Sequence, residues 1–244
     1  MIVIGPGQRE GLLLQFAKPG NYTIRQVILN DFEGEGEEYN PDLPAATIIV
    51  NTECAFEKAI DVSALAFTPG MNYTIEPEDI SSEASVNFAV QAQLDTAPVP
   101  QFVIDGKLFD FREITRTEEA KDASMWTLTS DMNYFHPFHI HVNPFQIKSM
   151  TTGGIDGRVR GGSLADATFD TNLQPENMWR DTIFIPPFGM VVIYQRFGGL
   201  STAWAGKTVF YCHFMDHEDQ GMIDAFLIAN PEATVSNETD QASI

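Results

Sequence analysis

Short runs of β-branched, aromatic and aliphatic residues recur along the whole chain, and Gly, Pro, Asn and Asp residues separate them. Many short strands with turn signals between them, and few long helical periods, indicate an all-β sandwich or barrel. Only residues 113–122 are compatible with a helix, and their threonines weaken that alternative. The expected strands are residues 11–16, 22–29, 46–50, 85–90, 126–129, 139–142, 181–185, 190–197 and 222–228.

The distribution of these strands predicts two unequal parts. Residues 85–230 are expected to form one complete sandwich, and residues 1–50 the closing strands of a partial preceding domain. Residues 51–84 would connect the two, and residues 231–244 form a polar tail that we expect to be frayed. Within the first part, residues 30–44 are acidic and contain glycine, which is typical of a loop or linker.

Composition narrows the choice of partners. The chain has 244 residues, and its 43% hydrophobic and 20% charged residues are ordinary for a globular protein. Lys and Arg total 14 against 34 Asp and Glu, a net charge of −20, which argues against nucleic acid or an anionic membrane surface as the partner. No apolar run approaches the roughly 20 residues needed to span a bilayer. Residues 1–10 lack the features of a signal peptide, so either the chain is cytoplasmic or its true beginning is absent.

Histidines are confined to two short segments. All five lie in residues 136–141 and 211–222. Histidines with scattered structural roles would not gather in this way. A metal site gives a reason for the clustering, because neutral imidazole is a favoured ligand of copper and zinc.

The second segment adds sulfur ligands to the imidazoles. His217 follows Cys212 by five residues, and Met222 follows five residues later. With His136 supplied by a distant strand, these residues make a His₂Cys set with a weak axial Met, the arrangement of blue copper proteins. Zinc more often uses several cysteines or a closed set without a thioether, so Met222 favours copper and zinc remains the alternative. The other cysteine, Cys54, is expected to be a small buried hydrophobe.

Strand geometry separates the histidines into two groups. In an extended strand, Cys212 points to one face while Tyr211 and His213 point to the other. By the same rule His139 and His141 share a face. One pair of strands could therefore present Cys212 to one metal and the three histidines 139, 141 and 213 to a second metal nearby, a layout that suits electron transfer.

Four motifs in consistent order carry a family resemblance: His136-Pro-Phe-His-Ile-His141, Asn143-Pro-Phe-Gln146, residues 179–187 (Trp-Arg-Asp-Thr-Ile-Phe-Ile-Pro-Pro) and Cys212-His-x-x-x-His-Glu-Asp-x-Gly-Met222. Over roughly residues 100–230 the chain resembles the C-terminal, plastocyanin-like cupredoxin domain of the multicopper oxidases, the laccase-like family. Residues 6–23 resemble the end of the preceding cupredoxin domain. The resemblance implies a cupredoxin-like Greek-key β-sandwich, preceded by a partial second cupredoxin domain.

The resemblance also implies a first metal centre. A type 1 copper would be held by His136, Cys212 and His217, with Met222 axial, and would take electrons one at a time from a small reducing substrate. In the family these electrons pass along the residues flanking the cysteine to a trinuclear copper cluster that reduces oxygen to water. Exported, periplasmic or extracellular, localisation is also typical of the family.

The remaining histidines correspond to ligands of that cluster. By position His139 would serve a type 2 copper, and His141 and His213 a type 3 pair. Glu218 occupies the place of an acid that relatives use to supply protons, although a merely solvated carboxylate is an equal alternative.

Two departures from the family bear on the second centre. The family has His-Cys-His where this chain has Tyr211 before the cysteine. A phenol, with a pKa near ~10, is a poor ligand unless the metal deprotonates it, and packing is its alternative role. The family also draws cluster ligands from two His-x-His motifs in its N-terminal domain, and this chain has no histidine before His136. An N-terminal cupredoxin domain or another chain would have to complete the cluster.

The leading hypothesis is therefore a copper-dependent oxidoreductase, the C-terminal part of a multicopper oxidase. Its alternative is a non-enzymatic blue-copper electron-transfer protein that uses the type 1 site alone. Tyr211 favours the alternative, whereas the retained His139, His141 and His213 favour the oxidase. A degenerate scaffold without copper is the third hypothesis, and the intact type 1 set argues against it.

Overall fold

A computed structural model describes nine stretches of the chain, and contacts divide it into two units, Arg9–Tyr73 and Met1–Gln8 with Thr74–Ile244. The described stretches are residues 6–9, 11–25, 44–51, 61, 74–91, 101–132, 135–151, 179–198 and 204–230. Within them no helix is long and apolar enough to cross a membrane. Cys54 and most of the expected 30–44 loop lie outside the described residues.

The described part of the smaller unit contains one pair of strands. β1 (Gly20–Arg25) and β2 (Pro44–Val50) run antiparallel, with an irregularity between Ile24 and Arg25. The strand expected at residues 11–16 is wrong, because these residues have no regular structure. Leu12, Leu13 and Leu14 are each about half exposed, so this apolar run does not lie on a buried face. That the unit is part of a cupredoxin domain remains a prediction.

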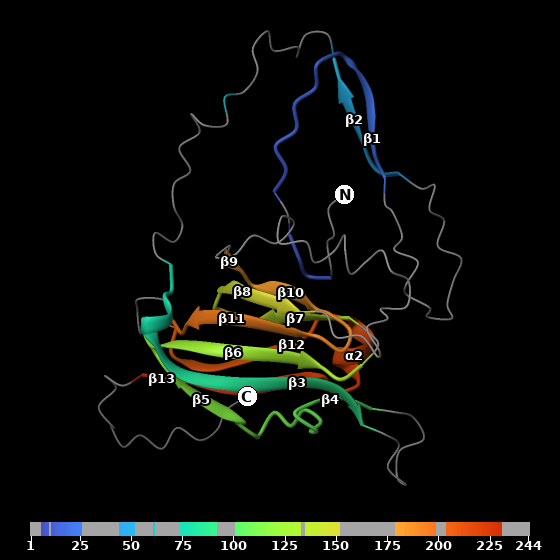
Figure 1. Cartoon of the computed structure of the whole chain (residues 1–244). Coiled ribbons are helices and arrows are strands. Elements are labelled where there is room, and N and C mark those ends of the chain that lie inside the picture. Colours follow the sequence, from blue (N-terminus) through green and yellow to red (C-terminus); the bar gives the residue numbers. More distant parts are fainter. Residues whose placement is uncertain are drawn as a thin grey trace, which may run out of the picture. The chain divides into compact units, whose positions relative to one another are not determined.

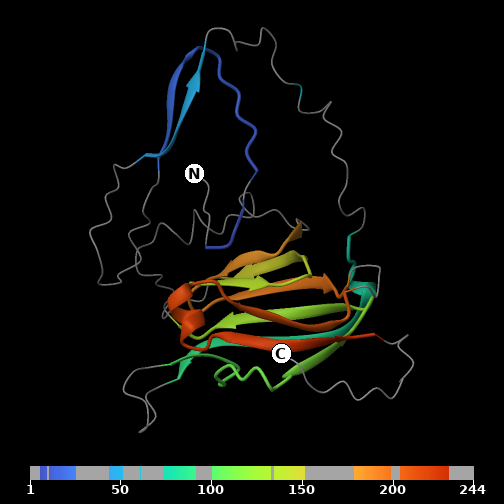
Figure 2. The ribbon, with the colours of Figure 1, turned by 180° about the vertical axis from the view of Figure 1, so that it is seen from behind.

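The larger unit is a sandwich of two β-sheets, which Figures 1 and 2 show from opposite sides. The five-stranded sheet has the order β10 (Thr182–Ile185), β7 (His136–Ile140), β12 (Gly206–Cys212), β13 (Ile223–Ala229) and β5 (Arg116–Glu119). The six-stranded sheet has the order β4 (Gln101–Ile104), β3 (Ile80–Gln91), β6 (Ala123–Ser130), β11 (Met190–Arg196), β8 (Phe145–Thr151) and β9 (Trp179–Arg180). The prediction of an all-β sandwich is confirmed.

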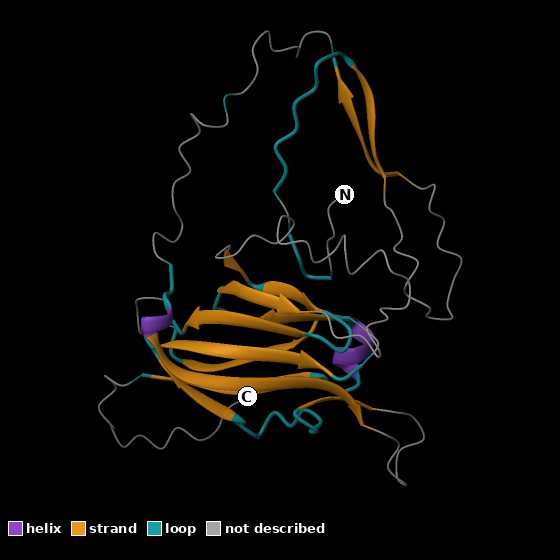
Figure 3. Ribbon diagram, in the orientation of Figure 1, coloured by secondary structure: helices purple, strands orange, loops and turns teal. Residues whose placement is uncertain are grey.

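Helical turns in the described residues are confined to the ends of this sandwich (Figure 3). They are η3 (Pro77–Asp79) and α2 (Met215–Asp219). The helical alternative for residues 113–122 is wrong, because β5 lies there and pairs in parallel with β13. Parallel neighbours cannot be joined by a tight hairpin, so this pairing could not be read from adjacent turn signals.

Aromatic side chains from both sheets meet in the core. Along β6 and β11, buried and less buried positions alternate with the period of two that one inward-facing strand surface requires. Trp126 of β6 lies 5.2 Å from Phe210 of β12 and 5.7 Å from Phe226 of β13, measured between ring centroids, and all three side chains are fully buried. Burying one phenylalanine stabilises a fold by about 1.5–3 kcal/mol. This packing holds β12 and its neighbour β7, which carry the candidate site.

Candidate metal centre

Cys212 and His136 are brought together by the pairing of their strands. β12 ends at Cys212 and β7 begins at His136, and the two strands run antiparallel with Cys212 opposite Phe138. The backbone N–H of His213 donates to the carbonyl of Pro137 at 2.7 Å, which extends this pairing past the end of β12. The cysteine therefore lies beside the histidine that begins the neighbouring strand.

His217 reaches the same point from α2. Its backbone N–H donates to the carbonyl of Phe214 at 3.0 Å, so the chain forms a helical turn directly after β12. The Cys212 Sγ lies 3.4 Å from Nδ1 of His217 and 3.6 Å from Nδ1 of His136. An ion bound by one sulfur and two imidazole nitrogens would separate sulfur from nitrogen by roughly 3.5–3.8 Å. The observed distances of 3.4 and 3.6 Å lie in this range to within about 0.1 Å, so the spacing fits an ion.

These three residues form the one group in the described stretches whose ligand atoms all lie within 4.8 Å of one another. Cys212 and His136 are fully buried, and His217 is 9% exposed. Burial raises the pKa of the Cys212 thiol to about 12 and lowers the pKa of His136 to about 3 and that of His217 to about 4. Both imidazoles are therefore neutral at pH 7, as metal ligands must be, and the thiol must lose its proton when an ion binds.

Met222 is placed next to the site by backbone hydrogen bonds. Its carbonyl accepts from the N–H of Cys212, and its own N–H donates to the carbonyl of His217, both at 3.0 Å. The Met222 side chain is fully buried in the cluster of core residues that includes Cys212. A thiolate and two imidazoles in a dry site suit copper, and the axial role of the thioether remains a prediction.

The other three histidines gather around Tyr211 on the opposite face of β12. Tyr211 is 9% exposed and lies opposite His139 of β7. Its ring centroid is 5.3 Å from that of His139, 5.4 Å from His141 and 5.3 Å from His213. These three histidines do not form a group of ligand atoms within 4.8 Å of one another.

Hydrogen bonds hold two of these histidines. The Tyr211 hydroxyl is 3.2 Å from Nε2 of His141, and Nδ1 of His139 is 2.9 Å from both the carbonyl of Asp181 and Oγ1 of Thr182. Burial raises the pKa of Tyr211, and the negative charges of Glu218 and Asp181 add to the effect. The phenol therefore stays protonated, and its hydroxyl forms a hydrogen bond with Nε2 of His141.

Comparison with known proteins decides the family. Residues 79–232 match the family described as multicopper oxidase. The chain belongs to the multicopper oxidase family. Membership implies copper, and the arrangement of His136, Cys212 and His217 is consistent with a type 1 copper site.

Relatives and solved structures agree with this assignment. The chain is 22% identical over 232 residues to a laccase of Bacillus subtilis and 22% identical over 248 residues to a laccase of Haloferax volcanii. These alignments cover 93% and 98% of this chain but 42% and 38% of the two laccases. A multicopper oxidase from Campylobacter jejuni, described as a metallo-oxidase, has a similar fold, with a TM-score of 0.58, 17% identity and coverage of 86% of this chain and 41% of that one.

Two further residues lie near the second group of histidines. Glu218 of α2 is half-buried, and its charge contributes to raising the pKa of both Tyr211 and Cys212. Gly7 has φ +75°, and a Cβ added there would overlap the ring of His213. Sequence reasoning identified Glu218 but missed Gly7, since no local pattern connects residue 7 with residue 213.

Proposed function

We propose that the chain is the C-terminal part of a copper-dependent oxidase in which His136, Cys212 and His217 would hold a type 1 copper, with Met222 as a further ligand. The convergence of one sulfur and two Nδ1 atoms in a dry site is the observation that carries this proposal. When bound, copper would supply one-electron chemistry, accepting single electrons from a small reducing substrate for transfer toward oxygen.

The residues of the chain prepare the site in three ways. Burial keeps His136 and His217 neutral, so that their Nδ1 atoms are available as ligands. Burial also excludes water from Cys212, whose sulfur can bind only after the thiol proton is lost. Finally, Cys212 is bonded directly to Tyr211 and His213, so a single peptide unit connects the two groups of side chains. That connection supports transfer of electrons from one site to the other.

Reduction of oxygen would need ligands beyond those of this chain. In this proposal His139 serves a type 2 copper, His141 and His213 serve a type 3 pair, and Glu218 supplies protons. The chain's five histidines are all assigned in this way, so an N-terminal cupredoxin domain or another chain must complete the cluster. Oxygen and a small reductant would be the substrates of that complete assembly.

One observation favours a second function. The hydrogen bond between Tyr211 and Nε2 of His141 engages a nitrogen that a type 3 copper would need. A protein that keeps this hydrogen bond would use the first site alone, as a non-enzymatic blue-copper electron carrier. The two functions differ in whether oxygen is consumed.

Copper loading of the full chain tests the proposal. We expect an intense blue absorption band from the wild type, no blue band from Cys212→Ser, and an unchanged band from the control Cys54→Ser. Circular dichroism would show that Cys212→Ser retains the sandwich. A colourless wild type would contradict the type 1 site. Oxygen uptake with a phenolic reductant, once N-terminal cupredoxin domains are added, would support the oxidase, and a blue protein without uptake in that mixture would support the carrier.

A further inference from the structure

A phenylalanine outside the ligand motifs stacks on one of the candidate ligands. The ring of Phe102 lies 3.7 Å from the imidazole of His217 between centroids, with 17° between the two planes. Phe214 meets the same imidazole edge-on, at 5.3 Å and 77°. The two aromatic rings therefore restrict both the position and the tilt of the His217 side chain.

The stacking joins the two sheets at one end of the sandwich. Phe102 belongs to β4 of the six-stranded sheet, where it lies opposite Val90 of β3. His217 belongs to α2, which connects β12 and β13 of the five-stranded sheet. Figure 1 shows β4 and α2 at the same end of the sandwich. The position of His217 thus depends on a strand that supplies none of the candidate ligands.

The chain after β4 also contacts residues 212–222, which carry three of the candidate type 1 ligands and are called the ligand loop below. The contact lies at the end of this loop opposite Cys212. Ile104 and Lys107 exchange backbone hydrogen bonds of 3.1 and 3.0 Å around Asp105 and Gly106, both with positive φ, so the chain reverses there in a tight turn. The N–H of Phe109 then donates to the carbonyl of Gly221 at 3.3 Å. Gly221 directly precedes Met222, so this segment contacts the loop close to the predicted axial ligand.

Close packing between Gly221 and Leu108 reinforces the contact between this segment and the ligand loop. Gly221 has φ +114°, and a Cβ there would lie 2.7 Å from Cδ2 of Leu108. Only glycine fits this position without displacing Leu108 or straining the backbone. Residues 102–109 therefore contact the ligand loop at two points, at His217 and at Gly221.

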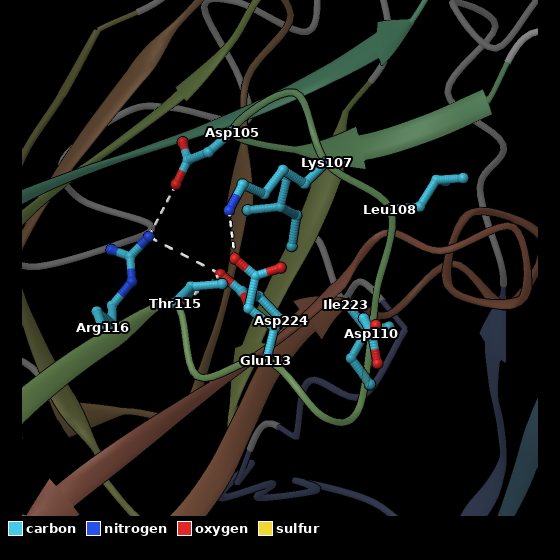
Figure 4. Close-up of a pocket in the computed structure, with 10 residues that line it drawn as sticks. Asp105, Lys107, Leu108, Asp110, Glu113, Thr115, Arg116, Ile223 and Asp224 are labelled. Atoms are coloured by element: carbon cyan, nitrogen blue, oxygen red, sulfur yellow. Dashed lines mark hydrogen bonds and ion pairs between the residues drawn. The ribbon is translucent and has the colours of Figure 1, made fainter.

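A small cavity beside this segment is lined by charged residues that pair with one another (Figure 4). Its volume is about 140 Å³, below the roughly 300–1,000 Å³ of typical ligand pockets. Arg116 reaches Asp105 at 2.8 Å and Asp224 at 3.9 Å, and Lys107 pairs with Glu113. These charged side chains therefore pair with one another rather than with a ligand in the cavity.

We propose that Phe102 is a positioning residue of the copper site, which fixes the imidazole plane of His217 and covers one of its faces. This inference rests on the proposed type 1 site. Side chains that orient metal ligands control the geometry and the retention of the ion, and their loss typically costs 10–100-fold in metal affinity. Replacing the ring of Phe102 with a smaller side chain would leave space over the imidazole, which could then tilt.

Phe102→Leu in the copper-loaded full chain is the test, with Phe111→Leu as the matched control because Phe111 is 63% exposed on the loop that follows. We expect Phe102→Leu to shift the blue band and the reduction potential and to release copper to a chelator about tenfold faster. Phe111→Leu should change none of these. Phe102→Trp, which keeps a stacking ring, should stay close to the wild type.

The outcomes separate this inference from the proposed function. A blue wild type with an identical spectrum, potential and copper release in Phe102→Leu would overturn the role of Phe102 alone. A wild type that never becomes blue would overturn the type 1 site and this inference together. If Phe102→Leu does not fold, Phe102→Met removes the ring at similar volume, and the same three measurements decide.

Discussion

The two faces of β12 carry similar residues but differ in what those residues do. On the inner face, Cys212 meets His136 and His217 with one ligand atom of each directed to a common point. On the outer face, Tyr211 lies among histidines of which His139 and His141 already hold hydrogen bonds. Histidine density alone therefore does not show on which face the chain brings a set of ligand atoms together. What distinguishes the inner face is that the ligand atoms converge.

Different degrees of burial explain part of the contrast between the inner and outer faces of β12. The inner ligands are at most 9% exposed, which keeps them neutral and dry. On the outer face, His141 is exposed and His139 is half-buried. A single step along a β-strand is enough to separate the two environments, because successive side chains point to opposite faces.

Replacing one histidine on each face of β12 should give the largest difference between the two faces. His136→Leu removes an inner ligand, and we expect copper affinity to fall more than about 100-fold with loss of the blue band. His139→Leu, in the same motif but on the outer face, should keep the blue band. Copper titration followed by absorption measures both variants. Equal losses of blue copper in the two variants would contradict the distinction between the faces.

The next largest effect should be the pH dependence of the free energy of unfolding of the metal-free protein. His136 and His217 have folded pKa values of about 3 and 4, below the value near 6.5 that an unfolded histidine has. Their contribution to stability is complete above pH 6.5 and is lost as the pH falls toward 4 for His217 and toward 3 for His136. For His136 we expect a loss of about 1.4 kcal/mol in the free energy of unfolding between pH 7.5 and 5.5.

Urea unfolding at both pH values measures this loss. The difference between wild type and His136→Leu isolates His136 from every other titrating group, including Asp224 and Glu118, whose pKa values are raised by burial. A variant that loses as much stability as the wild type over this range would show that His136 is not buried in its neutral form.

Gly7→Ala should have a smaller effect, confined to the outer face. The added methyl group would overlap the ring of His213 and force alanine to a positive φ, so we expect destabilisation by about 1 kcal/mol. Gly11→Ala is the control, because a Cβ there meets no atom within 4 Å. The blue band should survive both substitutions, and its loss in Gly7→Ala would mean that the two faces are coupled.

The smallest change is expected from Tyr211→Phe. Removing the hydroxyl deletes its hydrogen bond to His141, which is worth about 0.5 kcal/mol next to an imidazole that water can reach. The ring packing remains, so the blue band should not move. Thermal unfolding and the absorption spectrum measure the two effects. A large spectral change would place Tyr211 in the inner site.

The strands in which hydrophobic and polar residues alternate regularly could be predicted from the sequence. Burial along β6 and β11 alternates with a period of two, and the five-residue spacing of Cys212 and His217 places both ligands within one short segment of the chain. β5 was missed because its parallel partner, β13, lies more than a hundred residues away. The apolar run at residues 11–16 was misread, since hydrophobicity alone does not supply a partner strand.

The surroundings of the site were harder to predict than its ligands. The stacking of Phe102 on His217 depends on how two sheets close at one end, which no local pattern encodes. The contact of Gly7 with His213 likewise joins distant parts of the sequence. The hydrogen bonds of His139 involve Asp181 and Thr182, which lie in the motif of residues 179–187. The sequence therefore drew attention to these two residues but did not show that they contact His139.

X-ray absorption at the copper edge of the full chain, loaded with one equivalent of copper, tests the central claim most directly. We predict one short copper–sulfur distance and two imidazole nitrogens, with the sulfur signal absent in Cys212→Ser. A first coordination shell made only of nitrogen and oxygen atoms in the wild type would contradict the assignment of the copper to His136, Cys212 and His217.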